Sequence, residues 1–277
     1  MSQQASPQLR GARQRARQVG VTKDIYDPAY VADLFDRCSP KYRWWAAITS
    51  FGFVWLWRRQ CTARLLGHRG ISVLVTNDKA PGPPDIVDLM AGTGEVWPHL
   101  LRHWPKAQIT AIDISQSMHD EAVARLHAKR AHRIEHIAAN ALETDLPDQI
   151  ADLVVSTFGL KTFNTAQQTQ LAKQVARLLR PGGAFALIEA SDPKGWILRP
   201  LYRFYMDRVI PLVERFALRG AQDFSMIGQY SQNFGDCSVF AQALRDEGLI
   251  AKEERHFFGC ATSVAGVKPV AKPDHPA

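Results

Sequence analysis

The chain has 277 residues, of which 46% are hydrophobic, and this is enough apolar material for one large domain with its own core. Its formal net charge is +7, and part of the excess lies in four N-terminal arginines: Arg10, Arg13, Arg15 and Arg17. The four cysteines lie far apart and form no C-x-x-C pair. This spacing argues against both a zinc site and a disulfide framework, so buried reduced thiols and no metal are expected.

The N-terminal region does not resemble an export signal. Its first twenty residues are polar and lack the apolar segment that a signal peptide needs. The longest apolar run, Trp44 to Trp57, is interrupted by Thr49, Ser50 and Gly52, and about twenty residues are needed to span a bilayer. A cytoplasmic protein is therefore predicted. Residues 1–22 are expected to form a disordered basic arm, which either stays in solvent or contacts an anionic membrane; no RNA-reading module accompanies it, so no nucleic-acid partner is expected.

Residues 23–80 are expected to form a helical lid ahead of the main domain, with Ser39 as a helix cap and Pro40 in the first turn. This segment is unusually aromatic, with Trp44, Trp45, Phe51, Phe53, Trp55 and Trp57. At helical spacing such residues are typical of core packing. The alternative is an apolar entrance for a lipid-like ligand, with Arg58 and Arg59 at the boundary between membrane and water.

The run Asp85 to Leu89 is followed by two glycines one residue apart, Gly92 and Gly94, and then by helix-forming sequence. A short apolar run predicts a buried parallel strand, and the glycines let the backbone turn sharply and approach a ligand. These features indicate a nucleotide-binding turn. A dinucleotide site would need a third glycine where this chain has Trp97, so the dinucleotide interpretation is weakened.

Four further apolar runs follow at helical intervals, and each ends in a polar side chain. Residues 108–113 end in Asp113, which can accept hydrogen bonds from ribose hydroxyls. The next run ends at Asn140, which either bonds the edge of an adenine or forms a turn. Residues 151–157 and 178–189 complete five parallel strands, which place a ligand at their carboxyl edge.

Beyond the fifth strand the pattern becomes helical and then returns to strands. Residues 196–236 are expected to form a helical insertion on the substrate side of the domain. A helix over 239–247 and two strands over 250–267, with a turn near Gly259, complete a main domain spanning residues 81–268. Residues 269–277 are expected to form a flexible tail.

The ordered motifs D-x-x-x-G-x-G, an aspartate ending the second strand, and L-x-P-G-G before the fifth resemble class I S-adenosylmethionine-dependent methyltransferases. The resemblance narrows to the ubiquinone/menaquinone-biosynthesis C-methyltransferase family. The matching residues spread over most of 42–266: Ser50, Phe51, Gly52, Leu56, Trp57, Arg59, Asp113, Ile114, Ser117, Met118, Ala139, Asn140, Ala141, Phe158, Gly159, Leu160, Arg177, Leu179, Pro181, Gly182, Gly183, Tyr202, Tyr205 and Pro211.

The resemblance implies a Rossmann-like α/β fold with a mostly parallel seven-stranded sheet and helices on both faces. It also implies S-adenosyl-L-methionine as the cofactor and a hydrophobic aromatic, quinone-like molecule as the methyl acceptor. The expected cofactor-binding residues are Asp88, Ala91, Gly92, Gly94, Asp113, Ile114, Met118, Asn140, Ala141 and Thr157. Asp88 either orients the turn or reaches the methionine amino group, or it only caps the strand end.

Six positions depart from the family at places that the family uses for its substrate: Arg43, Ala46, Val54, Lys161, Thr162 and Arg203. Where this chain has Lys161, the family carries an arginine. A planar guanidinium that can donate two parallel hydrogen bonds is thus replaced by an ammonium group, which acts as a point charge. Lys161, Tyr42 and Tyr205 are the candidate catalytic residues. Lys161 either steers a phenolate or is a surface lysine, and each tyrosine either relays a proton or lines the acceptor site.

Three functions compete. The first is C-methylation of a quinone-like or other hydrophobic aromatic acceptor, with peripheral contact to the inner membrane face. The second is O- or N-methylation of a small molecule on the same fold, which the departures favour. The third is a module that holds the cofactor or a lipid ring without turnover. The acceptor and the methylated atom do not follow from the sequence, and the oligomeric state is open, a homodimer included.

Overall fold

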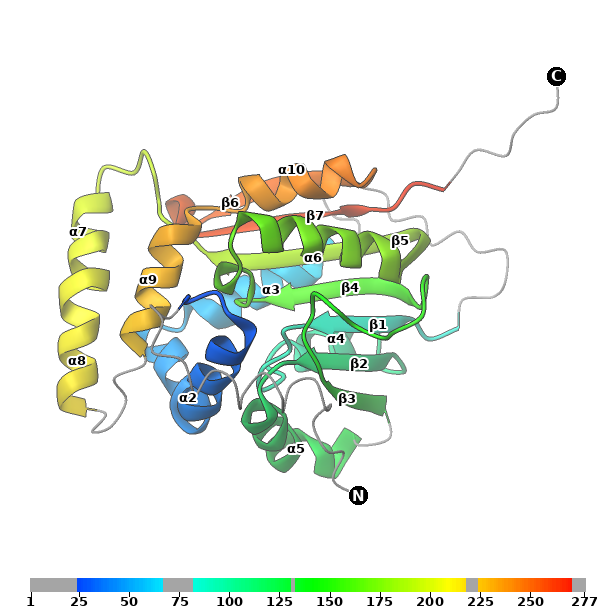
Figure 1. Ribbon diagram of the computed structural model, residues 1–277, viewed down its shortest axis with the longest axis horizontal. Coiled ribbons are helices and arrows are strands. Elements are labelled where there is room, and N and C mark those ends of the chain that lie inside the picture. The colour runs from blue at the N-terminus through cyan, green and yellow to red at the C-terminus, as the bar shows by residue number, and fades with distance from the viewer. Residues whose placement is uncertain (1–23, 67–81, 131–132, 218–223, 271–277) are drawn as a thin grey trace.

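The computed structural model describes residues 24–66, 82–130, 133–217 and 224–270. Within these ranges seven strands form one sheet in the order β3-β2-β1-β4-β5-β7-β6 (Figure 1). The strands are β1 (Asp85–Leu89), β2 (Gln108–Asp113), β3 (Ile134–Ala138), β4 (Ala151–Thr157), β5 (Leu179–Ala190), β6 (Ile250–His256) and β7 (Ala261–Val267). The predicted basic arm over 1–22 and most of the predicted tail lie outside the described residues.

Neighbouring strands pair in parallel except for β7, which is antiparallel to both β5 and β6. This confirms the predicted mostly parallel, seven-stranded sheet. From β1 the chain runs outward through β2 to β3 and then returns to place β4 on the other side of β1. The connections after β1 and β4 therefore diverge, and such a reversal leaves a crevice at the carboxyl ends of the two strands.

Helices cover both faces of the sheet, as predicted (Figure 1). α3 (Phe53–Arg64) and α4 (Trp97–His103) pack on one face, and α6 (Thr165–Leu178) and α10 (Ser238–Asp246) pack on the other. Side chains alternate along a strand, so successive strand residues pack into the cores on opposite faces of the sheet. Ile86 lies in the core beneath α3 and α4, and Val87 lies in the core beneath α6 and α10. Both faces are thus sealed, and the open edge at the strand ends is left for a ligand.

A third, smaller core joins the N-terminal helix to the insertion. α2 (Pro28–Thr49) contributes Leu34 and Trp45, which cluster with Ile210 and Tyr230. The insertion comprises α7 (Arg199–Phe204), the π-helical turn η3 (Tyr205–Val209), α8 (Ile210–Ala217) and α9 (Phe224–Phe234). In Figure 1 these helices stand beside α2 at the end of the sheet where β1 and β4 finish. The two segments together form a cap over the strand ends.

The start of the N-terminal helix differs from the prediction. Ser39 and Pro40 do not begin a helix, because α2 runs unbroken from Pro28 to Thr49. Asp27 is the N-cap, with its side chain accepting from the backbone N–H groups of Ala29 and Tyr30, and Pro28 occupies the first turn. The Asp27–Pro28 pair gives the same cap-and-proline signal as Ser39 and Pro40, but twelve residues earlier in the chain.

The other predicted helices are present with small shifts in their bounds. α5 (Gln116–Arg130) follows Ser115, whose hydroxyl oxygen accepts from the N–H of Met118 at 3.2 Å, and α10 covers the helix expected over 239–247. In the ranges described, no helix combines the length and apolar character that crossing a bilayer requires.

We expect Asp27→Ala to lower the free energy of unfolding by about 1 kcal/mol, because two backbone N–H groups at the start of α2 lose their acceptor. Urea denaturation followed by far-ultraviolet circular dichroism measures the change. Asp33→Ala is the matched control, since Asp33 lies on the same helix and makes only an exposed pair with Arg37. Equal unfolding free energies for the two variants would contradict the assigned cap.

Candidate active site

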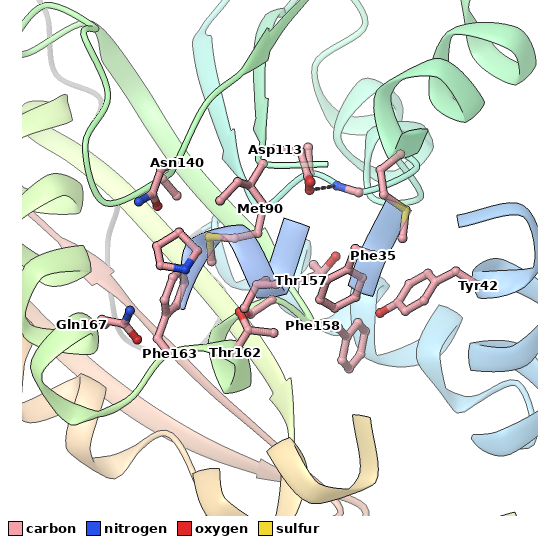
Figure 2. Close-up of a pocket in the computed structure, with 18 of the residues that line it drawn as sticks. Phe35, Tyr42, Met90, Asp113, Asn140, Thr157, Phe158, Thr162, Phe163 and Gln167 are labelled. Carbon is pink, nitrogen blue, oxygen red and sulfur yellow. Dashed lines mark hydrogen bonds between the residues drawn. The ribbon is translucent and has the colours of Figure 1, made fainter. Parts of the chain in front are cut away.

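The glycine-rich turn after β1 is pinned to the end of β2. The N–H of Ala91 donates to the carbonyl of Ile112 at 2.9 Å, and the N–H of Gly92 donates to Asp113 Oδ2 at 2.7 Å, the bond drawn in Figure 2. Gly92 has a φ of 56°, and a Cβ placed on it would meet no atom within 4 Å. The turn therefore presents bare backbone to open space, as close approach to a ligand requires.

Asp113 is held rigidly at the end of β2. Its Oδ1 accepts from the N–H of Ser115 at 2.8 Å, while Oδ2 accepts from Gly92. Burial raises the pKa of this carboxyl group, and the field of His119 and the two backbone donors oppose that rise. Each oxygen has a second lone pair available, so the side chain can still accept hydrogen bonds from a ligand's hydroxyl groups.

A cavity opens at the carboxyl ends of β1, β2 and β4 (Figure 2). Eight of the ten predicted cofactor residues line it: Ala91, Gly92, Asp113, Ile114, Met118, Asn140, Ala141 and Thr157. Phe35, Met90 and Phe163 add an apolar lining. Asn140 and Gln167 lie on the side of the cavity away from Phe35 and Tyr42 (Figure 2). The side-chain Oδ1 of Asn140 accepts from the N–H of Leu142 at 3.1 Å, so the side-chain amide is oriented by its own turn.

Asp88 and Gly94 do not line this cavity. Asp88 is buried beneath the turn and accepts from the indole Nε1 of Trp97 at 2.7 Å. Burial raises the pKa of Asp88 to about 8, against the effect of that hydrogen bond, and so favours the neutral carboxyl group. A Cβ on Gly94 would come within 2.5 Å of the Trp97 ring. Both residues thus support the indole where a dinucleotide fold has its third glycine.

Arg58 is not at the surface, so the prediction that it lies at a membrane boundary is wrong. Its side chain is buried, whereas the adjacent Arg59 is exposed. Arg58 Nη2 donates to Glu95 Oε2 at 3.1 Å and Nε donates to Thr157 Oγ1 at 3.4 Å. The guanidinium carbon also lies 5.1 Å from the centre of the Phe158 ring. Arg58 therefore joins α3 to the turn after β1 and to the end of β4.

Helical spacing could have located Arg58. It lies four residues after Val54 and three before Cys61, and both of these residues are buried on α3. The same spacing places Arg59 on the opposite, exposed face. Glu95 gives no comparable signal, because its burial depends on Arg58 and Arg125, which are distant in sequence.

A second, larger cavity lies under the cap, with a volume of about 590 Å³. Its walls are mostly apolar and come from α2, α3 and the insertion: Trp45, Ala46, Phe51, Phe53, Val54, Trp57, Trp196, Leu198, Leu201, Tyr202, Phe204, Tyr205, Met206, Val209, Ile210 and Phe257 are among them. Three residues line both cavities, Tyr42, Arg58 and Phe158. The two spaces therefore meet at this point.

The three predicted catalytic residues all line the second cavity, and Tyr42 also lines the first. Burial raises the pKa of Tyr42, against the opposing field of Arg58, and burial also raises that of Tyr205. Figure 2 shows the Tyr42 hydroxyl directed into the first cavity. The Tyr205 hydroxyl donates to the carbonyl of Thr49 at 3.2 Å, which ties the insertion to α2.

Lys161 is not a surface lysine. It follows β4 in the short helix η2 (Leu160–Thr162) and is buried. Its Nζ donates to Glu189 Oε1 at 2.7 Å and to the carbonyl of Phe158 at 3.0 Å. Glu189 is fully buried and also accepts from the backbone N–H groups of Lys161 and Ala190. This network holds the loop after β4 against the end of β5.

The sheet order, the glycine-rich turn and the acidic end of β2 define a class I methyltransferase fold. Solved structures of low identity share this fold: an O-methyltransferase family protein from Burkholderia thailandensis (21% identity, TM-score 0.50, 82% of this chain and 60% of that chain) and an N-methyltransferase from Haemonchus contortus (14%, 0.60, 90% and 61%).

Residues 22–268 match the ubiE/COQ5 methyltransferase family, and the chain belongs to that family. It is similar to a 2-methoxy-6-polyprenyl-1,4-benzoquinol methylase of Caenorhabditis elegans, with 29% identity over 66% of this chain and 65% of that protein. It is also similar to a demethylmenaquinone methyltransferase of Listeria welshimeri, with 26% identity over 79% of this chain and 87% of that protein. The chain is thus an S-adenosylmethionine-dependent methyltransferase, and the alternative of a module without turnover falls away.

We expect Asp113→Ala to weaken S-adenosylmethionine binding by about 1–3 kcal/mol, which corresponds to roughly 5- to 150-fold in affinity. The variant loses both a ligand-facing carboxylate and the bond that holds the turn at Gly92. Isothermal titration calorimetry measures the effect. Asp120→Ala, an exposed aspartate on α5, is the control and should bind as the wild type does. If the two variants bind equally tightly, Asp113 does not serve the cofactor.

Proposed function

We propose that this enzyme C-methylates a hydroxylated aromatic acceptor of the quinone type, in its reduced form. The observation that carries this proposal is the second cavity, which is large and mostly apolar and is called the acceptor cavity below. It meets the first cavity, called the cofactor cavity below, at Tyr42, Arg58 and Phe158. An aromatic ring with an apolar tail suits such walls, because its burial is favourable by roughly 25 cal/mol per Å². The names of the relatives from Caenorhabditis elegans and Listeria welshimeri, both quinone methylases, support the same acceptor class.

The residues of the first cavity fit the cofactor. We assign its methionine part to the backbone at Ala91 and Gly92, its ribose to Asp113 and its adenine to the Asn140 end. Ile114, Met118, Ala141 and Thr157 complete the walls. When bound, S-adenosyl-L-methionine supplies an electrophilic methyl group, and the electron pair of the broken sulfur–carbon bond stays on sulfur. Positioning accounts for much of the acceleration in a reaction of this type.

The acceptor must be activated, because an aromatic carbon is a weak nucleophile. Loss of the proton from a neighbouring ring hydroxyl makes that carbon electron-rich, and the carbon releases its own proton to water after it gains the methyl group. We assign Lys161 to steer the ionised ring, since this residue lines the acceptor cavity. Tyr42 and Tyr205 are assigned to relay the hydroxyl proton or to orient the ring.

One observation favours the second candidate, O- or N-methylation of another small molecule. Ala46 and Val54 line the acceptor cavity at positions where the family carries polar side chains. The cavity therefore offers fewer polar groups to a ring than the family pattern would. An acceptor with a different arrangement of oxygen or nitrogen atoms would suit these walls.

The test incubates purified protein with methyl-labelled cofactor and a reduced 2-prenyl-1,4-naphthoquinone. We expect a product that carries the label on the ring carbon, identified by nuclear magnetic resonance. A labelled methoxy product would favour the second candidate. If no label reaches this acceptor but a lipid or metabolite extract is labelled, the quinone proposal is wrong.

We expect Lys161→Ala to lower turnover by roughly 10- to 1,000-fold while cofactor affinity stays near that of the wild type. The reason is that Lys161 lines the acceptor cavity and not the cofactor cavity. Because Glu189 would be left as a buried unpaired charge, the combination of Lys161→Met with Glu189→Gln is measured as well. Lys173→Ala, on the exposed side of α6, is the control. Turnover at the wild-type level in both Lys161 variants would remove the residue from the mechanism.

We also propose that the enzyme is cytoplasmic and binds the inner membrane face reversibly. The support is a set of exposed apolar residues at the mouth of the acceptor cavity: Phe51 is 76% exposed, Leu201 64% and Phe204 59%. Exposed Arg203 lies on α7 with the latter two residues. An apolar patch of this kind next to cations suits the interface of an anionic bilayer. The four described cysteines are buried free thiols, which suits a reducing compartment.

Co-sedimentation with vesicles tests this proposal. We expect binding to vesicles that contain phosphatidylglycerol at low salt, and weaker binding at high salt, since each nearby cation contributes about 1 kcal/mol. Combining Leu201→Ser with Phe204→Ser should reduce binding, whereas Val239→Ser, an exposed apolar residue on α10, should not. A shortened protein that starts near Asp24 lacks the basic arm, and the difference between its vesicle binding and that of the full chain gives the contribution of the arm. If neither the full chain nor this form sediments with anionic vesicles at low salt, the acceptor is a soluble molecule.

A further inference from the structure

We propose that Arg58 binds the ring oxygen of the acceptor as an anion, next to the carbon that is methylated. This inference rests on the proposed function and adds an acceptor-binding residue to it. Arg58, Tyr42 and Phe158 are the residues that line both cavities in the described part of the chain. Arg58 is the one cation among them. A group that binds the acceptor at the point of methyl transfer must lie where the two cavities meet.

The guanidinium group is fixed in place and still has donors to offer. Two of its five N–H groups are used, Nε by Thr157 and Nη2 by Glu95. No acceptor within the described ranges takes a hydrogen bond from Nη1. The stack of the guanidinium on the Phe158 ring, at 5.1 Å, restricts its rotation. An oriented donor that needs no rearrangement can bind an oxygen with little entropic cost.

The charges around Arg58 favour an anion. Lys161 and Glu189 form a neutral pair at 2.7 Å. Glu95 is shared by two arginines, Arg58 at 3.1 Å and Arg125 at 3.7 Å. These five groups therefore sum to one positive charge beside a mostly apolar cavity. A buried excess charge is costly unless it is compensated, and an ionised ring oxygen would compensate it.

Three further titratable groups lie within the electrostatic reach of Arg58: Tyr42 on α2, Asp88 on β1 and His99 on α4. Burial favours the neutral form of Asp88, so this group compensates Arg58 less than an ordinary carboxylate would. Lys161 is a weaker candidate for the same contact, because two of its three N–H groups already serve Glu189 and Phe158. Arg58 keeps three donors available and has the planar geometry that suits an oxygen anion.

The experiment uses 4-nitro-1-naphthol, a bicyclic phenol whose anion absorbs visible light, bound to the full-length protein with S-adenosylhomocysteine. The pH titration of its absorbance gives the pKa of the bound phenol. In the wild type we expect this pKa to lie about one unit or more below that in Arg58→Met, because a nearby cation favours the phenolate. Affinity for the anion should fall about ten-fold or more in the same variant. Arg58→Lys should restore part of the pKa shift but not the full affinity.

Arg59→Met, on the exposed face of the same helix, is the matched control and should leave both quantities unchanged. In Arg58→Met, Glu95 keeps Arg125 and Thr93 as partners, and the combination with Glu95→Gln removes the buried carboxylate altogether. Arg58 and Glu95 line the first cavity, so folding of each variant is checked by thermal unfolding followed by circular dichroism. Arg58→Lys carries the test if Arg58→Met does not fold. The proposal is overturned if the bound phenol keeps the same pKa and affinity in the folded Arg58 variants as in the wild type.

The methylation assay separates this result from the proposed function. An Arg58-dependent pKa shift without ring methylation of the naphthoquinol would leave Arg58 as a phenolate-binding residue and reject the quinone acceptor. Ring methylation with a pKa that does not depend on Arg58 would keep the acceptor and reject the role of Arg58.

Discussion

The adjacency of β1 and β4 at the centre of the sheet is the constraint on which the site depends. Met90 follows β1 directly with a φ of 55°, and Phe158 follows β4 directly with a φ of 66°. Neither residue is a glycine, so each conformation is costly, and such residues gather where a site over-determines the backbone. Gly159 makes the arrangement possible, because any Cβ there would lie 2.5 Å from the Met90 Cβ. The chain diverges after β1 and β4, and this divergence leaves the crevice in which the first cavity forms.

A buried charge network then connects α3 to this space. Arg58 on α3 reaches Glu95 after the turn and Thr157 at the end of β4, while Lys161 and Glu189 join β4 to β5. Buried ion pairs add little net stability, but the loss of one partner is expensive. The network therefore fixes the geometry between the first and the second cavity. The apolar lid residues around it exclude water and strengthen these interactions.

Much of the fold was predictable because its signals are local. The apolar run ending at Leu89, the glycines at 92 and 94 and the acid at 113 each act within a few residues, and all three are where they were expected. Eight of the ten predicted cofactor residues line one cavity, since strand ends gather at one edge of a parallel sheet. The helix start at Asp27 was also present locally as a cap and a proline, although the similar pair at Ser39 obscured it.

The sequence by itself determined the order of the strands along the chain, the turn that presents bare backbone and the family of the enzyme, because propensity, glycine geometry and strand-end chemistry are properties of short segments. Helical spacing can place Arg58 on the buried face of α3, but only the tertiary structure decided what the buried charges contact. Arg58 and Arg59 are neighbours of the same type, yet one is buried against Glu95 and the other is exposed. The partner of a buried polar group is set by segments far away in the chain, and no local pattern specifies it.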